Sequence, residues 1–391
     1  MKRFSLFILF PIIFLFVDSF ILDIRTISNN DEIRFIYISY LEYLDNFKGN
    51  SMTINKSKID KIIDNVIFNK FNTIILHVSP FSDAIYNSEI FPYSYTLTGV
   101  EGKNPGFDYL EYFIKKAHSK KVSVHAWINP YRISSKNDLT MISSSNPALN
   151  FIEKEHARIS DKGIYYNPTS EEVKNLIERQ VLELIKNYEV DGIHFDDYFY
   201  VDEKIDITNY EKYKKNNGEL SLSEFRLMHT NDLIKRISLL IKKANKNIIF
   251  SISPDGNINN NYKYHYADVK AWIKNGYVDI IMPQLYYGFN NQYLPFEKAY
   301  FNWYNLIEES SFDIKIIPVL AFYKVGMVDK NAGTGSKEWL SEQIICRQIN
   351  YLKKSDYYHG FGLFRYDFLF NNNINNSISK KEVINIRNLC K

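Results

Sequence analysis

Between residues 33 and 389, short apolar runs rich in β-branched residues alternate with stretches of helical periodicity eight times over. Runs that are almost wholly apolar are typical of a parallel sheet covered on both faces. The predicted strands are Ile33–Ser39, Thr73–Val78, Val122–Ile128, Val190–Phe195, Asn247–Ser253, Val278–Leu285, Ile314–Leu320 and Gly360–Phe364. The predicted helices are Ile54–Phe71, Phe107–Lys120, Ser170–Tyr188, Leu222–Asn245, Tyr266–Gly276, Phe296–Ser310, Ser336–Lys354 and Lys380–Leu389.

This alternation predicts an α/β fold, the (β/α)8 TIM barrel, with long loops. A doubly wound sheet is the alternative, but it would usually carry a glycine-rich fingerprint after its first strand, and the sequence has none there. Runs rich in Asn and Lys at Tyr213–Gly218, Asn257–Asn261 and Asn371–Asn376 are expected to be loops. Because no linker rich in Pro, Gly or Ser divides the chain, we predict one domain over residues 29–391.

The N-terminus has the pattern of a targeting segment. Met1-Lys2-Arg3 is positively charged, and the run from Phe4 to Val17 contains no charge. That run is shorter than the roughly 20 residues of a membrane-spanning helix and fits a signal peptide. We therefore predict a signal peptide in residues 1–28, or an N-terminal anchor if it is not cleaved, since no A-x-A triplet follows. In both cases the body of the protein is expected outside the cytoplasm, secreted or held at a membrane.

Charge and cysteine content exclude several classes of protein. With 48 basic and 45 acidic residues the net charge is only +3, so we expect no nucleic-acid partner. The two cysteines, Cys346 and Cys390, are too few for a cysteine-ligated zinc site, an iron–sulfur cluster or a disulfide framework. The sequence also lacks H-E-x-x-H, G-x-S-x-G and P-loop motifs. We therefore expect no metal and no cofactor.

Polar and aromatic side chains gather where the predicted strands end, which is the active-site rim of such a barrel. Carboxylates beside Trp, Tyr and Asn suit a carbohydrate, because aromatic faces stack on sugar rings while polar groups bind hydroxyls. Glycoside hydrolysis needs two carboxyl groups that face one bond. The candidates for holding sugars are Asp83, His125, Trp127, Asn129, Arg132, His194, Tyr198, Asp255, Gln284 and Tyr286.

Asp196 is the leading catalytic candidate. Strand alternation puts Ile193 and Phe195 on one face and His194 and Asp196 on the other. Since the apolar pair should face the surrounding helices, Asp196 should point to the mouth of the barrel, and Asp197 should begin the loop. The alternative is that the two aspartates only turn the chain or cap the next helix.

Structural roles also remain open for other candidates. Glu42, which follows the first strand, is either a catalytic carboxylate or part of a salt bridge on the rim. Asp255 lies in an Asp-Gly pair, where a plain turn is as good an explanation as chemistry. His125 and His194 project inward under the same alternation, and interior histidines are often hydrogen-bonded core.

Several of these strand-end motifs match one known family. The matching stretches are Pro80–Tyr86, Leu97–Asp108, His125–Arg132, Asp191–Tyr200, Ser251–Pro254 and Pro283–Tyr286. Over about Glu32 to Phe370, the sequence resembles the bacterial glycosyl hydrolase-like 10 family of exported glycosidases.

The resemblance implies a (β/α)8 barrel that acts on a glycan, and some relatives are implicated in cleaving peptidoglycan strands. By similarity to barrel glycosidases, the carboxylate that ends strand four is the nucleophile or base, which corresponds to Asp196. The family commonly has Arg where this chain has Ser79, and an aromatic residue where it has Asp255. Substrate contacts at these two positions are therefore expected to differ.

We predict an exported glycoside hydrolase that cleaves a bacterial cell-wall glycan, either peptidoglycan strands or a related amino-sugar polysaccharide. Asp196 would be nucleophile or general base, with Glu42 or Asp197 as its acid partner. The alternatives are a non-catalytic glycan-binding barrel at the cell surface and a transglycosylase that uses the same residues.

Overall fold

The predicted strands meet in one parallel sheet in the computed structural model, which describes residues 32–374 and 376–389. The predicted targeting segment, residues 1–28, lies outside the described residues. The sheet has the order β10-β12-β13-β1-β2-β3-β7-β8-β9-β11. Its strands are β1 Ile33–Ile38, β2 Thr73–Ser79, β3 Ser123–Ile128, β7 Gly192–Phe195, β8 Ile249–Ile252, β9 Ile280–Ile281, β10 Gln284–Leu285, β11 Lys315–Ile316, β12 Val319–Leu320 and β13 Gly360–Leu363.

The sheet closes into a barrel, although its sixth and seventh strands are each interrupted once. β9 and β10 both come from the predicted sixth strand, and β11 and β12 both come from the seventh. The breaks fall at Pro283 and Pro318, since proline has no N–H to donate to a neighbouring strand. Hydrogen bonds continue across them: Val319 N donates to Pro283 O at 2.9 Å, and Gly362 N donates to Pro318 O at 2.8 Å. The sixth strand pairs with the fifth through β9 and β8, and with the seventh through β9–β11 and β10–β12. β12 then pairs with β13, and β13 with β1, so the eight strands form a barrel.

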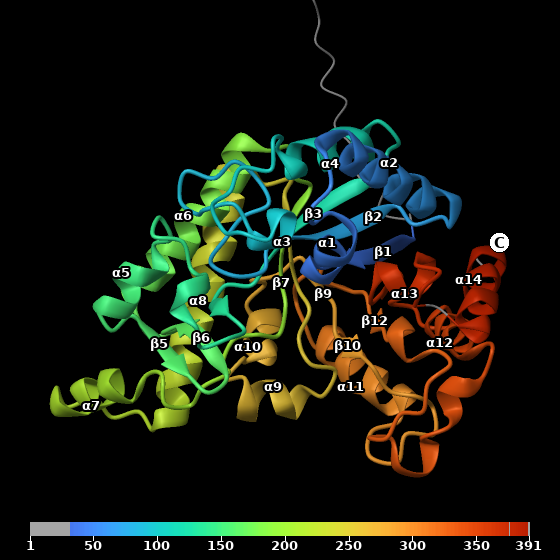
Figure 1. The fold of residues 1–391 in the computed structure, drawn as a ribbon. Coiled ribbons are helices and arrows are strands. Elements are labelled where there is room, and N and C mark those ends of the chain that lie inside the picture. The colour runs from blue at the N-terminus through green and yellow to red at the C-terminus, as the bar shows by residue number, and fades with distance from the viewer. Residues whose placement is uncertain (1–31, 375, 390–391) are drawn as a thin grey trace, which may run out of the picture. The chain divides into compact units, whose positions relative to one another are not determined.

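Helices follow the strands in turn and cover the sheet (Figure 1). The Ser170 hydroxyl caps α6 (Glu171–Asn187) by accepting a 3.3 Å hydrogen bond from Val173 N. Glu171 and Glu172 lie in the first turn of this helix, where negative charge is favourable. The covering helices are α2 Met52–Phe68, α4 Tyr109–His118, α6 Glu171–Asn187, α8 Leu222–Ala244, α10 Val269–Lys274, α11 Phe296–Glu308, α12 Ile344–Leu352 and α14 Ser377–Leu389. Shorter helices in the connections are α1 Tyr40–Asn46, α3 Tyr95–Thr98, α5 Ala148–Glu153, α7 Ile207–Lys215, α9 Ile258–Tyr264 and α13 Tyr366–Phe370.

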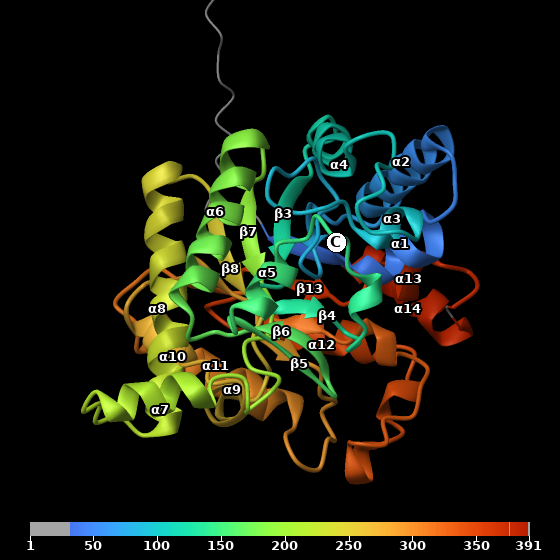
Figure 2. The same ribbon diagram turned by 60° about the vertical axis from the view of Figure 1, so that its left-hand side comes forward.

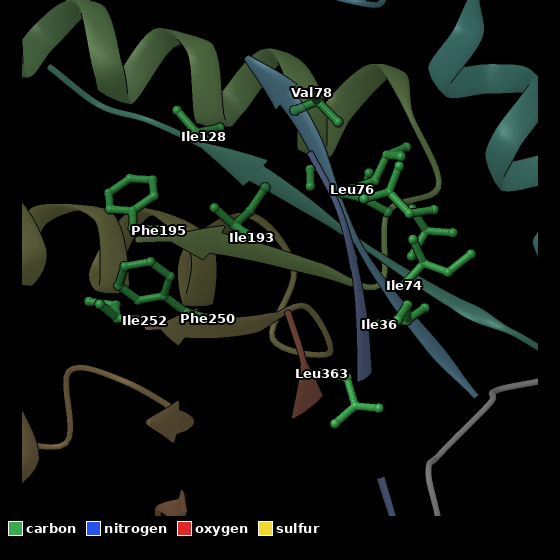
Figure 3. Close-up of a cluster of buried hydrophobic side chains, with 14 of the residues drawn as sticks. Ile36, Ile74, Leu76, Val78, Ile128, Ile193, Phe195, Phe250, Ile252 and Leu363 are labelled. Atoms are coloured by element: carbon green, nitrogen blue, oxygen red, sulfur yellow. The ribbon is translucent and has the colours of Figure 1, made fainter. Parts of the chain in front are cut away.

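A hydrophobic layer joins the outer faces of the strands to these helices (Figure 3). Its fully buried members include Ile36, Ile74, Leu76, Val78, Ile128, Ile193, Phe195, Phe250, Ile252 and Leu363. Since successive strand residues point to opposite faces, Ile193 and Phe195 on the helix side leave His194 and Asp196 facing the barrel axis. The core therefore fixes which side chains of β7 reach the interior.

The connection after β3 carries a small antiparallel sheet that the sequence did not predict. Its strands are β4 Arg132–Ser134, β5 Ala157–Ser160 and β6 Gly163–Tyr166, in the order β4-β6-β5. Figure 2 shows this sheet in front of the barrel, beside α5. It follows the C-terminal end of β3, so it lies on the side of the barrel where an active site forms.

Two other predictions of local structure are wrong. The helix predicted over Ser336–Lys354 begins only at Ile344, because Trp339 is buried and its carbonyl accepts a 2.7 Å hydrogen bond from Gly326 N. The run Asn257–Asn261 is mostly helix α9, because the Asn257 side chain caps it by accepting a hydrogen bond from Asn259 N at 3.0 Å.

Within the described part of the chain, no helix combines the length and the apolar character needed to cross a membrane.

Candidate active site

Two adjacent carboxyl groups stand at the C-terminal end of β7. Asp196 is only 5% exposed, and each of its oxygens accepts one hydrogen bond of 3.2 Å: Oδ2 from Asn129 Nδ2 and Oδ1 from the backbone N of Tyr198. Asp197 is the next residue and is partly exposed. The two groups therefore sit at the barrel mouth, one inside its wall and one at its edge.

Both carboxyl groups of this pair hold protons more tightly than ordinary aspartates. Burial and the neighbouring Asp197 carboxylate raise the pKa of Asp196 to about 7, against the opposing influence of Arg132. Burial also raises the pKa of Asp197, while His265 and the side chain of Gln284 counteract it. Two like charges on adjacent residues do not both ionise readily, so each carboxylate makes the other harder to ionise.

An aromatic layer lies directly beneath Asp196 in the barrel. Trp127 on β3 is buried, stacks on His77 of β2 and meets the ring of Tyr37 edge-on, with centroids 5.7 Å apart. The indole N–H of Trp127 has no acceptor within hydrogen-bond distance among the described residues, yet it lies near enough to Asp196 to favour the ionised carboxylate. His77 is a residue that the sequence analysis missed, although it interrupts an otherwise apolar strand.

The two predicted histidines lie deeper in the barrel. Nδ1 of His194 lies 2.8 Å from the Ser251 hydroxyl, and its Nε2 lies 3.5 Å from the Tyr37 hydroxyl. His125 packs below, against Gly192: a Cβ atom at Gly192 would lie 2.6 Å from Nδ1 of His125. Burial lowers the pKa of His125 to about 4, so the ring is neutral. Both histidines are buried and belong to the interior, so the structure does not bring them to the sugar-facing rim.

A polar cluster surrounds Asp197 on the side of β8 and β10. Gln284 donates from Nε2 to the Ser253 carbonyl at 3.0 Å, and its backbone pairs with that of Asp255. Asp255 turns the chain into α9: its Oδ1 accepts a 2.6 Å hydrogen bond from Asn257 N, and its Oδ2 lies 4.0 Å from Nε2 of His265. Gln284 and Asp255 are thus brought to the site. His265, at the end of α9, was missed, and no local signal in the sequence singles it out.

Arg132, the first residue of β4, is 7% exposed and lies near enough to Asp196 for its positive charge to oppose the rise in the pKa of that carboxyl. Its Nε donates to the Pro80 carbonyl at 3.1 Å. The guanidinium carbon lies 4.8 Å from the ring centroids of Phe81 and Tyr198 and 5.5 Å from that of Tyr40. Tyr198 itself is 40% exposed, so its ring offers a stacking face at the rim.

Burial raises the pKa of Tyr286, and the neighbouring tyrosines add to this rise. The negative charges of Asp197 and Asp196 raise it further, which indicates that the Tyr286 hydroxyl lies near the carboxyl pair. It is partly buried against Tyr323 and Phe364, with ring centroids 5.6 Å and 6.1 Å away.

Two carboxylates predicted to belong to the site, Glu42 and Asp83, form hydrogen bonds inside the protein instead. Glu42 is fully buried in the first turn of α1, where Oε2 accepts hydrogen bonds from N and Oγ of Ser39 at 2.8 Å and 2.6 Å. Its Oε1 accepts from Arg365 and from Asp367 N, so both oxygens are engaged in holding the fold. Asp83 is also fully buried, and its Oδ1 accepts a 3.2 Å hydrogen bond from Phe81 N. Neither side chain is placed where it could touch a substrate.

No group of three or more His, Cys, Asp or Glu side chains in the described ranges is arranged to hold a metal ion.

Comparison with known proteins decides the family. Residues 25–339 match the family model described as glycosyl hydrolase-like 10. The chain belongs to the glycosyl hydrolase-like 10 family. It is 30% identical over 369 residues to the glycosyl hydrolase YngK of Bacillus subtilis (strain 168), covering 87% of this chain and 71% of that protein. It is 31% identical over 298 residues to the glycosyl hydrolase DigH of Escherichia coli (strain K12), covering 70% of this chain and 67% of that protein.

Solved structures share the fold of this glycosyl hydrolase-like 10 protein. The glycoside hydrolase domain of PgaB (BpsB) from Bordetella bronchiseptica has a TM-score of 0.61 at 11% identity, covering 92% of this chain and 99% of that one. An α-amylase from Anoxybacillus has a TM-score of 0.56 at 12% identity, over 92% and 77% of the two chains. The predicted TIM barrel and the family resemblance are confirmed, and membership makes the chain a glycoside hydrolase.

Proposed function

We propose that this glycoside hydrolase is exported and cleaves a bacterial cell-wall glycan, either peptidoglycan strands or a related amino-sugar polysaccharide. The positively charged N-terminus followed by the uncharged run Phe4–Val17 supports export. An exported bacterial hydrolase meets the cell wall as its nearest polysaccharide. Aromatic and amide groups at the rim, with the exposed ring of Tyr198 foremost, suit the apolar faces and hydroxyls of sugar rings.

The observation that carries the proposal is the pair Asp196–Asp197 at the end of β7. Hydrolysis of a glycosidic bond uses one protonated and one ionised carboxyl group. Asp196 is the more buried of the two and has a pKa raised to about 7, so we assign it the role of the acid that protonates the leaving oxygen. Asp197 is closer to solvent, and although burial raises its pKa as well, His265 and Gln284 counteract that rise, so it would act as base or nucleophile.

This assignment reverses the roles predicted from the sequence, in which Asp196 was the nucleophile or base and Asp197 a candidate acid. It also leaves out Glu42, whose oxygens are occupied by Ser39, Arg365 and Asp367. A protein that only bound glycans would gain nothing from a carboxyl group with a raised pKa at its centre.

Release of reducing ends from a panel of glycans tests the substrate. Protein lacking residues 1–28 would be given peptide-stripped peptidoglycan strands, intact peptidoglycan, chitin oligomers and neutral glucans. We expect release from the stripped strands and little from the glucans. Release from glucans alone, or from none of the four, would contradict the proposed substrate. Fractionation of cells that produce the full chain tests export, which a wholly cytoplasmic protein would refute.

A further inference from the structure

Arg132 is a buried cation without an anionic partner in the described structure. It is 7% exposed, yet it forms no ion pair, and its single hydrogen bond runs from Nε to the Pro80 carbonyl. Its two terminal nitrogens, Nη1 and Nη2, donate to no described atom and are not sealed from solvent. A buried charge is normally paired, because removing it from water is costly. The free Nη1 and Nη2 donors of this guanidinium are therefore expected to bind an anionic group.

Two other buried arginines of the chain show what the normal arrangement is. Arg226 donates from Nε and Nη2 to Asp206 at 2.9 Å and 2.8 Å, and from Nη1 to the Tyr266 hydroxyl at 2.8 Å. Arg365 pairs with the buried carboxylate of Glu42. Arg132 has the same burial but lacks the carboxylate that these two arginines have inside the protein.

Packing holds the guanidinium of Arg132 ready for a ligand. The rings of Tyr40, Phe81 and Tyr198 lie over it, and the Nε hydrogen bond fixes its rotation. Aromatic rings cover guanidinium faces and leave the planar edge with its N–H donors open. That edge matches the two oxygens of a carboxylate, which arginine binds through two parallel hydrogen bonds.

Arg132 lies beside the catalytic pair, since its charge acts on Asp196. Tyr198 connects the two places, because its backbone N donates to Asp196 Oδ1 while its ring lies over Arg132. A group bound to Arg132 would therefore belong to a sugar at or next to the bond being cleaved. The raised pKa of Asp196, about 7, reduces the negative charge that such a group would face near neutral pH.

We propose that Arg132 binds a carboxylate on the sugar at the cleavage site, and hence that the enzyme selects an acidic glycan over a neutral one. This inference rests on the proposed function. N-acetylmuramic acid in peptide-free peptidoglycan and the uronic acids both carry such a carboxylate. A strand whose carboxylates are blocked should bind much more weakly.

Binding measured by calorimetry on the Asp196→Asn variant, which prevents turnover, tests the inference. The ligands are peptide-free peptidoglycan oligomers, the same oligomers with their carboxylates converted to methylamides, and oligouronates of equal length. We expect the acid form to bind roughly 10–100-fold more tightly than the amide, as for hydrogen bonds to charged groups. Adding Arg132→Gln should abolish this ratio, while Arg132→Lys should keep part of it.

Arg158→Gln is the matched control. Arg158 on β5 and Arg132 on β4 both pair with Tyr165 of β6, which lies between them in the small sheet. The Arg158 side chain forms a surface ion pair with Asp202 at 3.4 Å. Its loss should leave the acid-to-amide ratio unchanged. Thermal unfolding of every variant checks that the fold is intact.

The possible negative results distinguish the proposed carboxylate site from the proposed function. Equal affinity for acid and amide, or an Arg132→Gln variant that weakens both equally, would overturn the carboxylate site and leave the hydrolase proposal intact. Preference for oligouronates that Arg132→Gln abolishes would support the carboxylate site and overturn peptidoglycan as the substrate. Binding of none of these glycans would overturn the proposed substrate and the carboxylate site together.

Discussion

The imidazole of His77 lies flat against the indole of Trp127, with ring centroids 3.6 Å apart and 9° between the ring planes. Neither nitrogen of His77 has a hydrogen-bond partner among the described residues, and burial holds the pKa of this ring well below its usual range. The neutral histidine therefore holds the indole in place beneath Asp196 by stacking on it.

We expect His77→Ala to lower both stability and turnover. Loss of the buried ring should reduce the free energy of unfolding by about 2–4 kcal/mol. The freed indole would no longer stabilise the carboxylate that Asp196 becomes as it gives up its proton, so kcat should fall about tenfold or more. His77→Phe keeps a flat ring and should stay within about threefold of the parent. A His77→Ala enzyme with parental kcat would show that the stack has no part in catalysis.

The protonation of the pair predicts how activity depends on pH. Asp196 must be protonated to act as an acid, so kcat/KM should fall as pH rises through about 7. Asp197→Asn removes the negative charge that raises the pKa of Asp196, so the descending limb of the residual activity should move to lower pH. The profile is measured from pH 5 to 9 on the released product. A limb that stays in place, or moves to higher pH, would contradict the coupling between the two groups.

Asp83 predicts a pH dependence of stability. Burial raises the pKa of this carboxyl from 3.8 to about 7. The folded state therefore binds a proton that the unfolded state lacks between these values, and stability falls as pH rises through this range. Asp83→Asn removes the ionisation but keeps the oxygen that accepts from Phe81 N. We expect it to raise the free energy of unfolding by about 1–3 kcal/mol at pH 8 and to change little at pH 4.

Chemical unfolding of parent and Asp83→Asn at the two pH values measures this difference. Exposed Asp161→Asn serves as the control and should show no such pH dependence. Equal stabilisation at both pH values would mean that Asp83 does not titrate in the expected range.

Glu42 distinguishes a structural carboxylate from a catalytic one. Glu42→Gln removes the hydrogen-bonded partner of buried Arg365 and leaves only Asp367, 3.9 Å away, as its counter-charge, so we expect a loss of up to about 3–5 kcal/mol in the free energy of unfolding. Well below its melting temperature the variant should keep a kcat within about threefold of the parent. Adding Arg365→Gln should recover part of the lost stability, which a double-mutant cycle measures. A large loss of kcat with unchanged stability would instead make Glu42 the acid.

Much of the fold could be predicted because hydrophobic periodicity decides it. The apolar strands and amphipathic helices appear in the predicted order, and alternation along β7 correctly separates Ile193 and Phe195 from His194 and Asp196. The breaks in the sixth and seventh strands left a signal, since Pro283 and Pro318 stand inside the predicted runs.

Parts of the site could have been predicted more fully from local rules. Ser39 and Glu42 form an S-x-x-E capping box, which indicates that Glu42 caps a helix directly after β1. Alternation along β2 likewise places His77 on the inner face of the barrel.

Other features depend on contacts between distant segments, and a single sequence gives no measure of those. Arg132 meets Tyr40, Phe81 and Tyr198 from three separate connections. His265 nears Asp197 only because α9 folds back over the end of β8. The small sheet after β3 joins strands too short to show any periodicity.

The central claim is that Asp196 is a catalytic carboxyl group of glycosidic cleavage, and one substitution tests it directly. Reducing-end release and oligosaccharide binding would be measured side by side for the parent, Asp196→Asn and the surface control Asp161→Asn on peptide-stripped peptidoglycan strands. We predict that Asp196→Asn lowers kcat about 10²–10⁴-fold, the usual contribution of a general acid, while its affinity for the strands stays within about threefold. Turnover by Asp196→Asn at the parental rate would contradict the account.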